Sequence, residues 1–226
     1  MNCDNMNRTI RIRGNAVVTA PADITVVRAK VSGLAEDYAT ALKALAEVTK
    51  SLRDAVEKAG IPRNDLKTVN VSVKQHFKDV STGKDKNGNA KYRRVADGFQ
   101  YSQGVVFEFP NDNSKLSSAI WNISKCDIEP EIDFHYRNSD SNANKNRALA
   151  EAARNARTEA ETILGALGAR LGRIIEVDRQ SRLYDDYDGH RMILGDCNMS
   201  VAPDFEFEPE DEEFSESVTI EWEIED

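Results

Sequence analysis

The sequence predicts an α+β fold in which mostly antiparallel sheets are covered on one side by helices. Several segments alternate apolar and polar residues, and three others carry apolar residues at helical spacing. Together they follow the order ββ-α-ββ-α-β-α-β-loop-β, which suits helices on one side of a sheet better than a doubly wound parallel sheet. We expect the 226 residues to form one domain.

The longest predicted helix spans residues 141–167 and is expected to be the main cover of a sheet. Four polar residues at 139–142 are candidate N-caps, and Gly168 is placed to end the helix as its C′ glycine. The apolar face is mostly alanine, so we expect the helix to lie close to what it covers. This face consists of Leu149, Ala152, Ala153, Ala156, Ala160, Ile163, Leu164 and Leu167.

The first half of the chain is expected to form two strands, a helix and a long hairpin. The two strands lie within residues 8–36, and the capped helix follows at 37–60. Alternation then predicts a half-buried strand at 69–77 and an antiparallel partner at 99–109. A polar hairpin tip at 79–94 joins these two strands.

The second half adds a short helix within 111–123 and a strand at 131–136 before the long helix. A strand around 173–179 follows the long helix, and we expect it to use Ile175 and Val177 on one face.

The C-terminal part combines a loop and a strand. Residues 183–213 lack periodicity and are expected to form a variable acidic loop, whereas the last strand at 218–224 has one apolar and one acidic face. The acidic run at 204–213 is interpreted as solvated. Phe205 and Phe207 within it leave room for an edge strand that docks on a neighbouring subunit.

Charge and composition exclude two classes of partner. Asp and Glu number 39 against 30 Lys and Arg, so the net charge is −9, without a strong basic stripe. Nucleic acid and anionic lipid both require clustered positive charge, so we expect neither as a partner. No apolar run is long enough to cross a bilayer, so we also expect no membrane insertion.

The N-terminus, MNCDNMNRTIRIRG, contains no apolar segment of the kind that a signal peptide requires. The sequence as written therefore predicts a cytoplasmic protein. A periplasmic or envelope protein whose N-terminus was trimmed is the alternative.

Three widely spaced cysteines exclude a disulfide framework and a CxxC zinc site. Cys126 follows an apolar helical pattern and is expected to be a small buried residue. One disulfide between Cys126 and Cys197 is left open.

Two groups of residues are candidate sites. Residues 184–192, YDDYDGHRM, match three positions of a calcium loop, but Tyr184 and Gly195 occupy the positions of its first Asp and its final Glu. Asp133 and His135 share a strand face and could begin a metal site or an acid–base pair, yet they lack a third ligand. We therefore assign no catalytic, cofactor-binding or metal residue, and no cofactor.

The hairpin tip forms a small basic patch that includes Lys84, Lys86, Lys91, Arg93 and Arg94. Aspartates dilute the charge of this patch, so we interpret it as a solvated tip. A salt bridge to an acidic neighbour is the functional alternative.

Several stretches, in their order and spacing, resemble the SIMPL-domain family of bacterial periplasmic immunogenic proteins and an animal kinase-associated adaptor. They are IRIRGNAVVTAPADI, AVEKAGIPRNDLKTVNVSV, FHYRNSD, RALAEAARNARTEAETILGALGARLGRIIEV and SVTIEWEIE. The resemblance implies an α+β fold, a tendency to form large oligomers and a stress- or envelope-related role. It implies no established catalytic residue, cofactor or substrate.

Three functions follow as hypotheses. We predict a non-catalytic protein that assembles with itself, at least as a dimer, because strand edges can pair with another chain. Another protein is a second candidate partner. The alternatives are a metal-dependent hydrolase that uses Asp133 and His135, and a signalling adaptor that rests on the resemblance alone.

Overall fold

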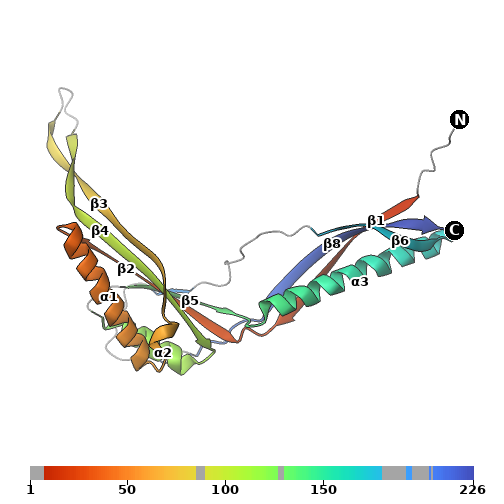
Figure 1. Cartoon of the computed structure of the whole chain (residues 1–226), viewed down its shortest axis with the longest axis horizontal. Coiled ribbons are helices and arrows are strands. Elements are labelled where there is room, and N and C mark those ends of the chain that lie inside the picture. The colour runs from red at the N-terminus through yellow and green to blue at the C-terminus, as the bar shows by residue number, and fades with distance from the viewer. Residues whose placement is uncertain (1–7, 85–89, 127–129, 180–191, 195–203, 205) are drawn as a thin grey trace. The chain divides into compact units, whose positions relative to one another are not determined.

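A computed structural model describes residues 8–84, 90–126, 130–179, 192–194, 204 and 206–226. The chain divides into two compact units (Figure 1). We call residues 1–23, 137–187 and 209–226 the α3 unit, and residues 24–136 and 188–208 the hairpin unit. Each unit has its own hydrophobic core, and the prediction of one domain over the whole chain stays a prediction.

The predicted order of elements is confirmed, with two short additions. Arg63–Asp65 form a 3₁₀ turn, and the strand β7 (Met192–Leu194) lies inside the segment predicted as a loop. The remaining elements are β1 (Thr9–Ala20), β2 (Ile24–Ala35), α1 (Tyr38–Lys58), β3 (Lys67–Lys84), β4 (Ala90–Pro110), α2 (Asn113–Ser124), β5 (Glu131–Arg137), α3 (Ser141–Leu167), β6 (Arg170–Asp178) and β8 (Glu212–Glu225).

The α3 unit is a three-stranded sheet of order β1-β8-β6 with helix α3 along one face (Figure 1). Both strand pairs are antiparallel, and β1 pairs with β8 without interruption from Thr9 to Ala20. The core combines small side chains from helix α3 and β1 with larger ones from the last strand: Ala16, Ala152, Ala156, Ala160, Val218, Ile220 and Trp222. The predicted apolar face of β8 is thus confirmed.

Helix α3 touches the sheet through a narrow stripe of alanines. The buried positions Ala148, Ala152, Ala156 and Ala160 lie four residues apart. A methyl group built at Gly14 of β1 would lie 2.7 Å from the backbone nitrogen of Ala156. The expected close approach of this helix is therefore confirmed.

The end of helix α3 departs from the predicted face. Ile163 and Leu167 were expected to face the sheet, but Leu167 is 76% exposed and Ile163 is also exposed. The buried residues of α3 form a stripe only one residue wide. At 3.6 residues per turn, neither Ile163 nor Leu167 falls on this stripe. Gly168 ends the helix with a φ of 74°, as predicted.

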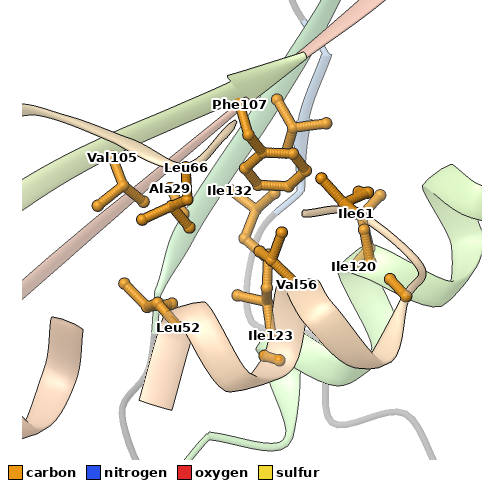
Figure 2. Close-up of a cluster of buried hydrophobic side chains, with 14 of the residues drawn as sticks. Ala29, Leu52, Val56, Ile61, Leu66, Val105, Phe107, Ile120, Ile123 and Ile132 are labelled. Atoms are coloured by element: carbon orange, nitrogen blue, oxygen red, sulfur yellow. The ribbon is translucent and has the colours of Figure 1, made fainter. Parts of the chain in front are cut away.

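The hairpin unit is a five-stranded sheet of order β3-β4-β2-β5-β7, with α1 and α2 on one side (Figure 1). Asp37 caps α1 by accepting a 2.9 Å hydrogen bond from the backbone N–H of Thr40, and Asp112 caps α2 in the same way through Lys115. Figure 2 shows Leu52 and Val56 of α1, and Ile120 and Ile123 of α2, meeting side chains from the sheet. The sheet contributes Ala29, Val105, Phe107 and Ile132 to this cluster.

The strand expected to be half-buried, β3, exposes much of its apolar face, and so does β6. Val69 and Val71 of β3 stand in solvent, and so do Ile175 and Val177 of β6. Each strand lies at the edge of its sheet. The buried helix residues pack on β2, β4 and β5 in the hairpin unit, and on β1 and β8 in the α3 unit. Periodicity predicts apolar faces for these strands, but not that the other described elements leave those faces uncovered.

Candidate functional site

The predicted pair Asp133 and His135 lies on β5, an interior strand between β2 and β7. Asp133 is buried and His135 is half-buried. His76 lies on β3, which is separated from β5 by two strands, so the described residues do not bring these two histidines together. His190 lies outside the described residues.

In the ranges that the structure describes, no group of three or more His, Cys, Asp or Glu side chains could hold a metal ion. Of the calcium-like segment, Met192 alone lies within these ranges. Cys197 lies outside them. The Cys126–Cys197 disulfide and the metal-dependent hydrolase therefore stay predictions. The thiol of Cys126 is partly covered, with its Sγ 3.8 Å from the backbone oxygen of Ser51.

The edge strand β3 is the candidate interaction surface of the hairpin unit. Among the described strands it pairs only with β4, so the other edge of an 18-residue strand has no described partner. We call its exposed apolar side chains, Val69, Val71, Phe77 and Val80, the β3 edge surface. Exposed apolar groups beside an open strand edge are typical of a surface that pairs with another chain.

Helix α1 adds exposed apolar groups near this edge. Tyr38 and Leu42 begin the predicted apolar face of α1, but about half of each residue is exposed. The ring of Tyr38 meets Phe99 of β4 edge-on, with centroids 5.8 Å apart, and Phe99 is the register partner of Gln75 in β3. The start of α1 is therefore close to β3 without covering it.

The outer part of the hairpin carries positive charge. Lys78 forms a 2.7 Å ion pair with Asp97, and the guanidinium of Arg94 lies over the ring of Phe77 at 5.0 Å from its centroid. Lys91 and Arg93 are exposed. The described part of the predicted basic patch is thus solvated, with one aromatic contact on its own strand pair.

The α3 unit has a second apolar edge at β6. Ile174, Ile175 and Val177 are all exposed, and we call them the β6 edge surface. Among the described strands, β6 pairs only with β8, and the register between them shifts on both sides of Ile174.

The acidic face of β8 is matched by arginines from its neighbours. Arg173 of β6 forms two 2.7 Å hydrogen bonds to the carboxylate of Glu223, and this pairing holds the pKa of Arg173 above its usual value. Arg11 of β1 lies 3.9 Å from Glu221. The face opposite helix α3 therefore pairs carboxylates of β8 with arginines of β6 and β1.

A family model with the description "SIMPL: Protein of unknown function (DUF541)" matches residues 10–222, nearly the whole chain. This chain belongs to the SIMPL family. The resemblance inferred from the sequence is confirmed, and so is the α+β fold that it implied.

Two relatives of this SIMPL chain are the 26 kDa periplasmic immunogenic proteins of Brucella melitensis biotype 1 and Brucella abortus strain S19. Each is 26% identical over 176 residues, a stretch that covers 76% of this chain and 67% of the relative. The names of these relatives favour the periplasmic alternative over the predicted cytoplasmic location. Among the described residues, no helix combines the length and apolar character that crossing a membrane requires.

One expectation for the SIMPL chain is corrected at Phe207. This side chain was offered as part of an edge strand that docks on a neighbouring subunit. Its ring instead packs on Phe134 in the core of its own unit, with centroids 5.4 Å apart, and its backbone oxygen accepts a 3.1 Å hydrogen bond from Asn113. Phe205 and most of the predicted loop lie outside the described residues.

Sequence reasoning missed a hydrogen-bonded junction in the α3 unit, centred on the buried Asn138. Its side-chain amide donates to the backbone oxygen of Pro21 at 2.7 Å, and its Oδ1 accepts from the side chain of Asn144 at 2.9 Å. Beside it, Ser139 donates through both its backbone N–H and its hydroxyl to Asp23. The sequence signal for this junction is the polar run Asn138-Ser139-Asp140 directly after β5.

Proposed function

We propose that this SIMPL protein is a non-catalytic protein that assembles with copies of itself in the bacterial periplasm or envelope. The observation that carries the proposal is that β3 and β6 expose apolar side chains beside backbone edges that pair with no other described strand.

Self-association can pair the backbone groups of such edges and bury their apolar side chains. An unpaired strand presents backbone N–H and C=O groups to any other strand, and large apolar side chains beside it gain by leaving water. Burying one valine or leucine side chain is worth about 1.5–3 kcal/mol, so several per copy offset much of the cost of association. A second copy of the chain is the partner that is always present at the protein's own concentration.

The location is proposed from the relatives. Both are named as periplasmic proteins, and the matched region covers most of this chain. Osmotic-shock fractionation of the native host checks the location. Retention of the protein in the cell together with a cytoplasmic marker would contradict it.

Size-exclusion chromatography with light scattering tests the assembly. One chain has a mass of 25.2 kDa, and we expect at least twice this mass at micromolar concentration. A strict monomer under these conditions would remove the proposal.

A further inference from the structure

The outer part of the β3–β4 hairpin, residues 74–97, differs from the rest of the chain in its charge, and we call it the hairpin arm. It contains seven Lys and Arg against three Asp, in a chain whose net charge is −9. Asp97 is neutralised within the arm by a 2.7 Å ion pair with Lys78. Lys91 and Arg93 are exposed and form no ion pair with a described residue. The arm therefore presents positive charge that is available to a partner.

Large apolar side chains are exposed among these cations. Tyr92 is 65% exposed, Phe77 40% and Val80 39%. In the strand register, Arg94 lies between the rows of Phe77 and Tyr92, so these three side chains share one face of the hairpin. Aromatic groups that alternate with cations are typical of surfaces that bind a lipid–water interface. There the rings enter the head-group region while the cations meet phosphate.

The arm extends past the start of helix α1 (Figure 1). This helix begins at Tyr38, whose ring meets Phe99 of β4. A strand rises by about 3.3 Å per residue, so Tyr92 lies about 20 Å further along the hairpin than Phe99. The Debye length at physiological ionic strength is about 8 Å, so the charges of Glu36 and Asp37 beside the start of α1 are largely screened at Tyr92. The net charge of the whole chain, which argues against anionic lipid, therefore does not by itself decide what the arm can bind.

We propose that the hairpin arm binds the surface of a membrane that contains anionic phospholipid, with its cations at the phosphates and Tyr92 and Phe77 in the head-group region. Each Lys or Arg close to such a surface strengthens binding about fivefold. The excess of seven Lys and Arg over three Asp, which is four charges, therefore supports weak and reversible binding.

An acidic protein would match the charge of the arm equally well. The two rings favour the membrane, because large exposed apolar groups gain most where an apolar phase lies directly behind the phosphate layer. The proposed envelope location would bring the arm within reach of a membrane. The inference does not depend on self-assembly.

Co-sedimentation of the full chain with lipid vesicles tests the proposal. At about 50 mM salt we expect the wild type to bind vesicles of about 70% phosphatidylcholine and 30% phosphatidylglycerol, but not vesicles of phosphatidylcholine alone. Near 1 M salt the Debye length falls to about 3 Å, so the protein is expected to be released. Lys91→Glu with Arg93→Glu is expected to weaken binding at least ~20-fold. Lys50→Glu with Lys58→Glu changes the net charge equally on the exposed side of α1, and we expect it to weaken binding by less than about threefold.

A tyrosine substitution tests the aromatic part of the contact. We expect Tyr92→Ser to weaken binding to the anionic vesicles by about 3–10-fold, because part of the ring leaves water in the bound state. Tyr38 is an exposed tyrosine outside the arm, so Tyr38→Ser is the matched control and is expected to bind like the wild type. The substituted side chains are all exposed, so we expect every variant to fold, which far-UV circular dichroism checks.

Three results would overturn the membrane contact. They are a wild type that does not bind the anionic vesicles, equal weakening by the hairpin and α1 charge variants, and unchanged binding of Tyr92→Ser. Retention of the wild type on immobilised polyglutamate without vesicle binding would assign the arm to an acidic protein instead. These outcomes are separate from self-assembly: an oligomer that does not bind vesicles leaves the assembly standing, and a monomer that binds them leaves the membrane contact standing.

Discussion

Gly14 decides how closely helix α3 can lie on its sheet. A methyl group at this position would lie 2.8 Å from the Cβ of Ala156 and still closer to the carbonyl oxygen of Ala152. Both neighbours are held in a helix, so neither can move aside alone. We expect Gly14→Ala to lower the free energy of unfolding by about 3 kcal/mol, the upper end for overpacking. Urea denaturation followed by circular dichroism measures this change.

Gly165 is the matched control for Gly14 because it lies in helix α3 itself. Apart from the backbone of its own helix turn and its two chain neighbours, no heavy atom of the described residues lies within 4 Å of a methyl group added there. Alanine is a better helix former than glycine, so Gly165→Ala is expected to raise the free energy of unfolding by about 0.5–1 kcal/mol. Equal effects of the two substitutions would show that contact with the helix does not explain Gly14.

Asp23 links the Asn138 junction to pH. The hydroxyl and the backbone N–H of Ser139, each 2.6 Å from the Asp23 carboxylate, lower the pKa of Asp23 below its ordinary value of 3.8. A carboxyl whose pKa is lower in the folded state stabilises the fold above its unfolded-state pKa. That contribution disappears as the pH falls through the folded-state pKa.

Asp23→Asn, which does not titrate, isolates this effect. We expect the wild type to have the higher urea midpoint by a constant margin between about pH 5 and 7, where the carboxyl is charged in both states. The margin is expected to shrink below about pH 4, as the carboxyl becomes protonated. A margin that does not change down to pH ~3 would contradict the role given to Ser139.

At the scale of elements, helix α3 shows how far local chemistry predicts structure. Its bounds, its terminal Gly168 and its close approach follow from capping residues and an alanine-rich face, all of which are local properties. The edge strands show the limit. Alternation in β3 and β6 predicts strands correctly, but whether a face is covered depends on which elements pack there. The Asn138 junction could not be predicted for a related reason. Its partner Pro21 is far away in the sequence, and its partner Asn144 is a polar residue that belongs to no apolar pattern.

The alanine stripe gives the prediction at this scale. Ala156 is fully buried between helix α3 and the sheet, whereas Ala150 of the same helix is exposed. Ala156→Leu is expected to lower the free energy of unfolding by about 1–3 kcal/mol, because the larger side chain forces the helix away from β1. Ala150→Leu is expected to change it by less than about 0.5 kcal/mol. Thermal or urea unfolding of the two variants side by side measures the difference.

At the scale of the whole molecule, net charge and its distribution have different consequences. A net charge of −9 makes copies of the chain repel one another at long range, which opposes association at low salt. The hairpin is the local exception, since residues 74–97 contain seven Lys and Arg against three Asp, and a local positive charge acts over the short distances of a formed contact. The sequence alone shows that the hairpin is positive while the whole chain is negative. Whether the hairpin can contact another chain depends on β3 being an edge strand, which only the strand order shows.

Reversing the charge of the hairpin separates these two effects. Lys91→Glu with Arg93→Glu makes the hairpin acidic, whereas Lys50→Glu with Lys58→Glu changes the net charge equally on the exposed side of α1. At about 50 mM salt we expect the hairpin variant to dissociate at a concentration at least ~10-fold higher than the α1 variant, as light scattering of a dilution series would show. Near 1 M salt the Debye length falls to about 3 Å, so the two variants are expected to converge. Equal weakening of both at low salt would mean that only net charge matters and that the hairpin makes no specific contact.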